Sequence, residues 1–283
     1  MHFDWHFTAI QILWTLTFAG QLVLAVVLLG RDRIRCFPWF TAVVVATILQ
    51  LLIGRELYGR LPQLTLAAIL IVFSDVVAIL GLLVIAELAR KAFAGVSRPL
   101  FFVNLAGFLL IAAGIMFKWG PWPSWKTLTA ESQMATLRVL ELIAQKTQLL
   151  VNLLNIELGL MVVIFGRNFK APWKSHTQRI VIGFSTAALG ALAVQIIWQI
   201  AARTVAPHSQ AELQRALDFR DHLFNGNRAL DVGVLIWWIA CLWIDEPRPG
   251  AAAATPTIPL PPPDVPAEAE APAEPSADEA AAE

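Results

Sequence analysis

The sequence predicts an all-α, polytopic seven-transmembrane-helix bundle that ends in a disordered C-terminal tail. Hydrophobic residues make up 57% and charged residues only 15% of the 283 residues, whereas soluble domains average roughly 45–50% apolar and about 25% charged residues. Mean hydropathy is +0.63, and long uncharged runs recur over residues 1–245. Prolines fall between these runs or at their ends, where they disrupt a helix least. These observations exclude a soluble enzyme, a nucleic-acid-binding protein and a disulfide-stapled secreted domain.

Seven runs are long enough, or nearly so, to cross a bilayer core, which takes about 20 helical residues. In chain order they cover residues 8–30, 37–54, 63–89, 100–117, 138–166, 180–202 and 228–244. The first run has no basic segment before it and no small-residue cleavage site after it, so we expect it to remain in the mature chain. The fifth is long enough to tilt strongly or to project from the membrane. Together the runs define a predicted membrane domain over residues 1–245.

Between the sixth and seventh runs the sequence predicts a separate short helix. Ser209 and Glu212 form a capping-box pattern at its start, and Asn225-Gly226 is typical of a helix stop. Three apolar side chains between them share one helical face: Leu213, Leu217 and Phe224. The pattern favours an amphipathic helix that lies on the outer membrane interface, and a lid over an outer pocket is the alternative.

The basic residues of the loops favour one orientation. Ten Lys and Arg residues lie in the first, third and fifth loops, and eight lie on the opposite side. Short cytoplasmic loops carry the excess of basic residues in membrane proteins. We therefore expect a multi-pass protein of the bacterial cytoplasmic (inner) membrane, with the N-terminus outside and the C-terminus in the cytoplasm.

Residues 246–283 form the predicted disordered tail. They hold eight acidic residues against the single basic Arg248, and ten of the 17 prolines of the chain. Such a segment has too few bulky apolar groups to offset the entropy lost on ordering. We interpret it as an acidic cytoplasmic arm, which is either a solvating tether or a docking segment for a cytoplasmic protein partner.

Polar side chains within the spans are candidate functional residues, because burying them in hydrocarbon is costly. At about 1.5 Å of rise per residue, four of them are predicted to lie at a similar depth: Asp75, Asp231, Asn152 and Asn155. Glu157 and Gln21 fall near the membrane midplane. Arg228 stands one turn before Asp231 and could neutralise it. Two nearby carboxylates that share a proton would suit proton coupling.

The fifth predicted span carries a polar stripe. Its members are spaced by four, three, four and three residues, which places all of them on one helical face: Glu141, Gln145, Gln148, Asn152 and Asn155. Such a stripe faces the bundle or a wet cavity rather than lipid. It serves either as hydrogen-bonding glue between helices or as a pathway for a ligand or a proton.

The usual catalytic signatures are missing from the sequence, which has no H-E-x-x-H, no G-x-S-x-G, no P-loop and no paired C-x-x-C. We expect no cofactor and no metal. Four histidines on the outer side are the candidates if a divalent metal binds, although such histidines are more often simply solvated: His2, His6, His208 and His222. Cys36 and Cys241 are expected to be buried thiols at helix ends rather than a disulfide.

Two segments carry a resemblance to known proteins. The Arg-rich first inner loop runs into Arg35-Cys36-Phe37-Pro38-Trp39-Phe40, and the seventh span closes on Trp243-Ile244-Asp245-Glu246-Pro247. With the seven spans, this pattern resembles uncharacterised bacterial seven-helix integral membrane proteins over about residues 1–247, and the resemblance implies no known activity. The layout also looks like that of the SWEET sugar transporters in helix count and orientation, but their proline-glutamine loop signature is absent at the corresponding helix ends.

Three classes of function follow from these features. We predict a non-enzymatic sensory or scaffolding helical bundle, which contacts the lipid bilayer and uses its acidic arm on the cytoplasmic side. The alternative is a small-solute or proton-coupled carrier that uses Asp75 and Asp231. An intramembrane enzyme is the third class, and the lack of a nucleophile–base or metal constellation disfavours it. The sequence does not identify the small ligand.

Overall fold

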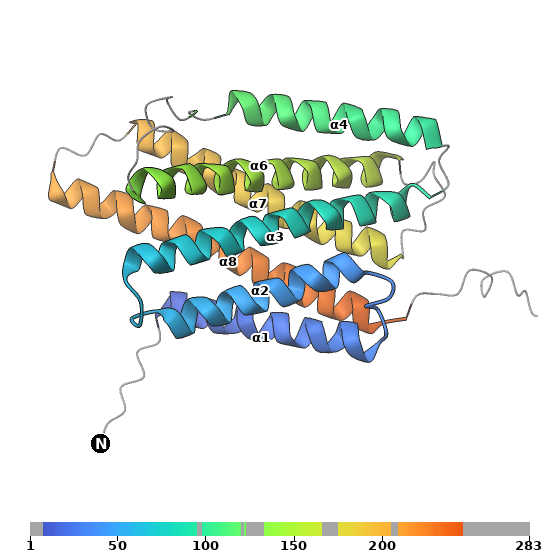
Figure 1. The fold of residues 1–283 in the computed structure, drawn as a ribbon, viewed down its shortest axis with the longest axis horizontal. Helices are drawn as coiled ribbons and strands as arrows, with labels where there is room; N and C mark the ends of the chain where they lie inside the picture. The colour runs from blue at the N-terminus through green and yellow to red at the C-terminus, as the bar shows by residue number, and fades with distance from the viewer. Residues whose placement is uncertain are drawn as a thin grey trace, which may run out of the picture. The chain divides into compact units, whose positions relative to one another are not determined.

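The computed structural model describes residues 8–94, 98–119, 122, 133–165, 175–204 and 209–245. Over these residues the chain is helical and contains no strand (Figure 1). Seven helices follow one another in this part of the chain: α1 (Ala9–Gly30), α2 (Pro38–Leu57), α3 (Gln63–Ala92), α4 (Arg98–Lys118), α6 (Gln133–Phe165), α7 (His176–Thr204) and α8 (Gln210–Trp243). The predicted all-α fold class is confirmed.

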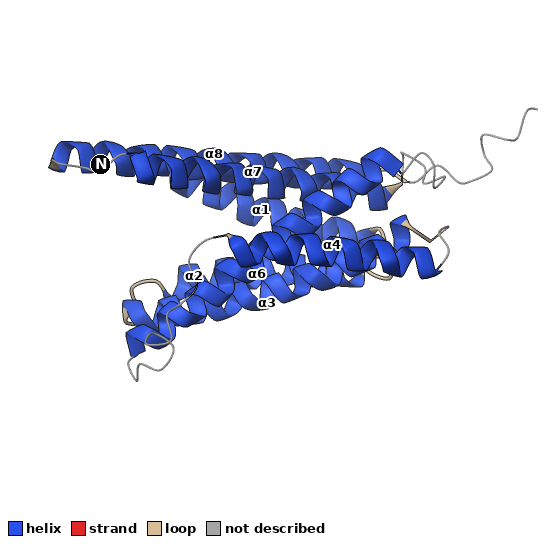
Figure 2. Cartoon of the chain, turned by 90° about the horizontal axis from the view of Figure 1, so that it is seen from above, coloured by secondary structure: helices blue, strands red, loops and turns tan. Residues whose placement is uncertain are grey.

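The helices run side by side and alternate in direction (Figure 1). α1, α3, α6 and α8 begin at one end of the bundle, which we call the Thr8 end, and they finish at the other, the Asp245 end. α6 packs against α3, α4 and α7, whereas α8 packs against α1 and α7. Figure 2 shows α1, α7 and α8 on one side, and α3, α4 and α6 on the other. The two sides are joined by the contact between α6 and α7 and by α2, which contacts both α1 and α3.

Five helices in the described part of the chain are long and apolar enough to cross a membrane. They are α1, α2, α3, residues 134–164 of α6 and residues 176–202 of α7. This set is consistent with a multi-pass membrane protein. α4 and α8 fall outside it: among the described residues the apolar stretch of α4 covers Leu105–Lys118, and α8 carries charged side chains over its first half.

The first turn of α2 is capped by a side chain from another helix. Phe37 precedes the helix and provides no side-chain cap. Instead, Glu87 of α3 accepts hydrogen bonds from the backbone N–H groups of Trp39 (3.2 Å) and Phe40 (3.4 Å). Lys91 pairs with the other carboxylate oxygen at 3.1 Å. The carboxylate therefore satisfies two backbone donors that a helix start leaves free, and its negative charge faces the positive end of the helix dipole.

An aromatic cluster forms the core near the Asp245 end. Phe40 of α2 meets the ring of Trp238 edge-on at 5.3 Å and that of Phe184 at 5.7 Å between ring centroids. Gly183 lets the Trp238 indole approach α7, because a Cβ at this position would overlap the indole nitrogen. That nitrogen donates a hydrogen bond to the Ile180 carbonyl. Rings from three helices thus meet in one contact, in the edge-to-face arrangement that aromatic pairs prefer.

α8 is one continuous helix, so the prediction of a separate short helix that stops at Asn225-Gly226 is wrong. The predicted start is correct, because the Ser209 hydroxyl accepts a hydrogen bond from the Glu212 N–H at 3.2 Å. The helix then continues through Gly226 to Trp243. A glycine inside a helix costs only about 1 kcal/mol relative to alanine, and the packing of α7 along α8 offsets that cost.

Candidate functional site

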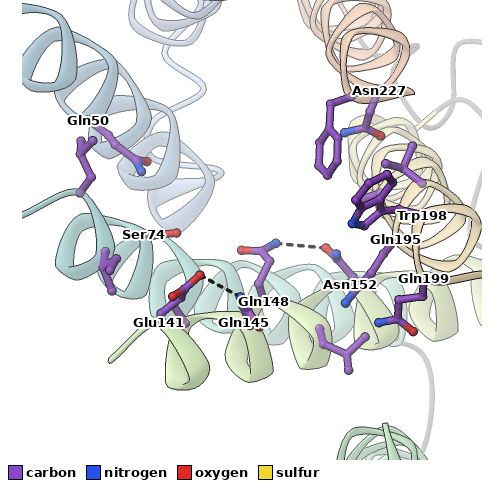
Figure 3. Close-up of a pocket in the computed structure, with 17 residues that line it drawn as sticks. Gln50, Ser74, Glu141, Gln145, Gln148, Asn152, Gln195, Trp198, Gln199 and Asn227 are labelled. Carbon is purple, nitrogen blue, oxygen red and sulfur yellow. Dashed lines mark hydrogen bonds between the residues drawn. The ribbon is translucent and has the colours of Figure 1, made fainter. Parts of the chain in front are cut away.

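A polar cavity of about 650 Å³ lies between α2, α3, α6, α7 and α8 (Figure 3). Seven of its lining side chains end in a primary amide, so we call it the amide cavity: Gln50, Gln145, Gln148, Asn152, Gln195, Gln199 and Asn227. Ser74, Glu141 and Trp198 complete its polar lining. The volume lies within the range of small-molecule sites, about 300–1,000 Å³.

The cavity lies next to a close contact between α6 and α7. α6 and α7 are in close contact at Gly159, where the Ser185 side chain occupies the space that a Cβ would need. The Ser185 hydroxyl donates to the Asn155 carbonyl at 2.7 Å, which fastens the helices at this level. Nearer the Thr8 end, residues 141–152 of α6 and 191–199 of α7 line the cavity between them. Small residues therefore hold the two helices together just beyond the cavity.

The polar stripe predicted for α6 forms one wall of the amide cavity. Figure 3 shows two hydrogen bonds along it, from Gln145 to Glu141 at 3.2 Å and from Gln148 to Asn152 at 3.1 Å. Asn155, the fifth member of the stripe, is buried beyond the cavity and does not line it. In the described part of the chain, no hydrogen bond joins cavity-lining side chains of two different helices.

The opposite wall was not predicted from the sequence. Gln195 and Gln199 of α7 lie one helical turn apart and line the cavity together with Trp198 (Figure 3). α2 contributes Gln50 and α8 contributes Asn227. The spacing of four between the two α7 glutamines was the available signal, since residues four apart share a helix face. The Oδ1 atom of Asn227 is buried and has no hydrogen-bond partner.

A second cavity, of about 550 Å³, adjoins the first and is more strongly charged. We call it the charged vestibule. The two cavities are continuous, because four residues line both of them: Glu141, Gln145, Trp198 and Phe224. α8 adds four polar residues to the vestibule alone: Arg220, Asp221, Asn225 and Arg228. Ile10 of α1 also lines it, which places the vestibule near the Thr8 end.

The predicted intramembrane residues are only partly brought together. Of the six, only Asn152 lines the amide cavity. Asp75 follows the cavity-lining Ser74 on α3 and does not line the cavity itself. Three of the six have a buried side-chain oxygen without a hydrogen-bond partner: Gln21, Asp75 and Glu157.

The levels of α3 and α6 explain why Asp75 and Asn152 are separated. A Cβ added at Gly81 of α3 would contact Val151 of α6, so these two residues lie at the same level. The helices run in the same direction. Asp75 therefore lies level with about residue 145 of α6, which is roughly 10 Å from the level of Asn152 at 1.5 Å of rise per residue.

Asp231 is partnered by an amide rather than by Arg228. Its Oδ2 atom accepts a hydrogen bond from Asn227 at 3.4 Å. Arg228 instead donates to Asn225 at 3.5 Å, on the side of α8 that lines the vestibule. Arg228 lies three residues before Asp231 and Asn227 lies four residues before it, and both spacings can share a helix face. Of these two described residues, only Asn227 bonds to Asp231.

The histidines and cysteines predicted as candidates for metal and thiol chemistry differ in whether the structure describes them and in how exposed they are. Among the described residues, no group of three or more His, Cys, Asp and Glu side chains could hold a metal ion. His2, His6 and His208, and the predicted tail over 246–283, lie outside the described residues. His222 is described and exposed. Cys241 is buried as expected, whereas Cys36 is exposed because it lies in the turn between α1 and α2.

Comparisons with known proteins identify no relative: no family model, curated protein or solved structure matches the chain.

Proposed function

We propose that this chain is a non-enzymatic membrane protein that senses a small polar solute held in the amide cavity. The observation that carries the proposal is the convergence of amide groups from α2, α6, α7 and α8 on one cavity within a bundle of apolar helices. A primary amide offers both donors and an acceptor. Such a lining therefore suits a solute that carries several hydrogen-bonding groups.

The hydrogen bonds within the cavity favour a binding site over a purely structural role in holding helices together. Polar glue stabilises a membrane bundle by joining side chains of different helices. In the described residues, the lining amides bond only along their own helix, as Gln148 does with Asn152 and Asn227 with Asp231. The facing groups, such as Gln195, are left available to a solute.

The proposal includes seven spans in the bacterial inner membrane, with the N-terminus outside and the C-terminus in the cytoplasm. α4 and α8 run alongside the five apolar helices and connect the same two ends of the bundle (Figure 1). Counted as spans, they place the two termini on opposite sides. The charged vestibule would then open toward the outside, and the acidic tail would provide the cytoplasmic contact of a sensor.

A thermal-shift screen of purified full-length protein tests the proposal. A solute that binds the native state stabilises it by about 2.7 kcal/mol at a concentration of 100 times Kd. We expect Gln148→Leu to abolish the shift, because it removes an amide from the cavity wall. Thr147→Val is the matched control, since Thr147 is the next residue of α6 and does not line the cavity. Equal shifts in both variants would contradict binding in the amide cavity.

A carrier is the second candidate, favoured by the unpartnered buried oxygens of Asp75 and Glu157. A carboxylate in an apolar helix is costly and often marks a proton or substrate pathway. Reconstitution separates the two functions, because a carrier loads liposomes with the solute whereas a sensor binds it without net flux. If flux occurs, Asp75→Asn should abolish it, because the variant removes the carboxylate while it keeps the shape of the side chain.

A further inference from the structure

Two opposite charges without charged partners face the charged vestibule. Glu141 of α6 accepts a hydrogen bond from the neutral amide of Gln145. Arg228 of α8 donates to the neutral amide of Asn225. None of the ion pairs among the described residues includes Glu141 or Arg228. Arg220, in contrast, has the adjacent Asp221 at 3.5 Å.

We infer that the solute is a small zwitterion, namely a free amino acid with a polar, uncharged side chain. This inference rests on the proposed function. Glu141 takes the ammonium group of the solute and Arg228 takes its carboxylate, because guanidinium and carboxylate form charge-assisted hydrogen bonds. The two walls of the vestibule thus complement the two charges of one molecule.

The surroundings of the two charges define the rest of the solute. Trp198 and Phe224 line both cavities, so aromatic side chains lie at the junction of the charged vestibule and the amide cavity. Aromatic faces also attract cations, which reinforces the ammonium position beside Glu141. Beyond them the amide cavity presents Gln148, Gln195 and other amides but no basic side chain. A side chain that ends in an amide or hydroxyl group would meet matching donors and acceptors there.

Titration of the purified full-length protein with L-glutamine and L-serine tests the inference. We expect at least one of them to bind. N-acetyl-L-glutamine lacks the ammonium charge and L-glutaminamide lacks the carboxylate, so each should bind at least tenfold more weakly than L-glutamine, which is about 1.4 kcal/mol. Glucose, an uncharged polyol, serves as the comparison solute. Binding of glucose without either amino acid would overturn the zwitterion inference and leave the proposed function standing, whereas failure of every polar solute would overturn both.

Two charge-neutralising variants assign the solute groups to the two residues. Glu141→Gln should weaken L-glutamine binding at least tenfold and leave the residual binding of N-acetyl-L-glutamine unchanged, because that analogue has no ammonium for Glu141. Arg228→Gln should weaken L-glutamine in the same way and leave L-glutaminamide unchanged. Unchanged L-glutamine binding in both variants, with a lower melting temperature of the ligand-free protein, would show a structural role for the charges and overturn the inference.

Discussion

The Glu87 carboxylate shows how much one residue determines at the start of a helix. It belongs to α3, yet it satisfies the backbone N–H groups of Trp39 and Phe40 in α2, and its side chain is only 7% exposed. Hydrogen bonds to a charged group contribute about 1.5–3 kcal/mol. The same carboxylate also holds Lys91, which lies over the Phe37 ring at 3.9 Å. One side chain thus links the turn before α2 to α3.

We predict that Glu87→Ala lowers the free energy of unfolding in detergent by about 1–3 kcal/mol, because it removes the acceptor of two backbone N–H groups at the start of α2. Glu87→Gln keeps an acceptor oxygen and should lie between wild type and alanine. The matched control is Glu56→Ala, which removes an exposed ion pair between Glu56 in the last turn of α2 and Arg60 in the turn that follows, and it should cost only about 0.3–0.5 kcal/mol. Equal losses in Glu87→Ala and Glu56→Ala would show that the cap contributes nothing.

At the scale of elements, hydropathy predicted the helices well and their ends less well. The predicted spans 8–30, 37–54 and 63–89 nearly match α1, α2 and α3. α8 differs because the sequence stop signal at Asn225-Gly226 is local, whereas continuation depends on a neighbour. Gly190 of α7 leaves space for Leu230 of α8, a contact between residues far apart in the sequence. Local turn propensity was therefore outweighed by packing between two helices.

Substitution of Gly226 tests whether α8 is continuous. A Cβ at Gly226 meets no other atom within 4 Å, so Gly226→Ala should stabilise the protein by about 0.5–1 kcal/mol through the better helix propensity of alanine. Gly59, in the turn after α2, has a φ of +80°, and Gly59→Ala should destabilise by about 1 kcal/mol or more. Chemical denaturation of both variants decides the matter. Destabilisation by both would place a break in α8 at Gly226.

For the molecule as a whole, the sequence predicted one wall of the amide cavity but not the complete site. The spacing of Glu141, Gln145, Gln148 and Asn152 is a property of a single helix, so it is readable from the sequence. Which helix faces that wall depends on tertiary packing, and the α7 wall of Gln195 and Gln199 was missed for that reason. The predicted depths of the polar residues were counted from charged residues at the helix ends. That count could not show that α3 and α6 are shifted along their axes, which the position of Gly81 opposite Val151 shows.

The positions of the basic residues predict the orientation of the molecule in the membrane. Six basic residues lie in the described turns and helix ends at the Asp245 end: Arg31, Arg33, Arg35, Arg90, Lys91 and Arg179. We expect this end to be cytoplasmic, because short cytoplasmic loops are enriched in Lys and Arg. An impermeant maleimide on intact cells should then miss Cys36, which is exposed at this end, and should label a Tyr58→Cys variant, because Tyr58 is 78% exposed at the Thr8 end. Cys241 is buried and reports on neither side. Cys36 should react once the cells are permeabilised, and its labelling in intact wild-type cells would reverse the proposed topology.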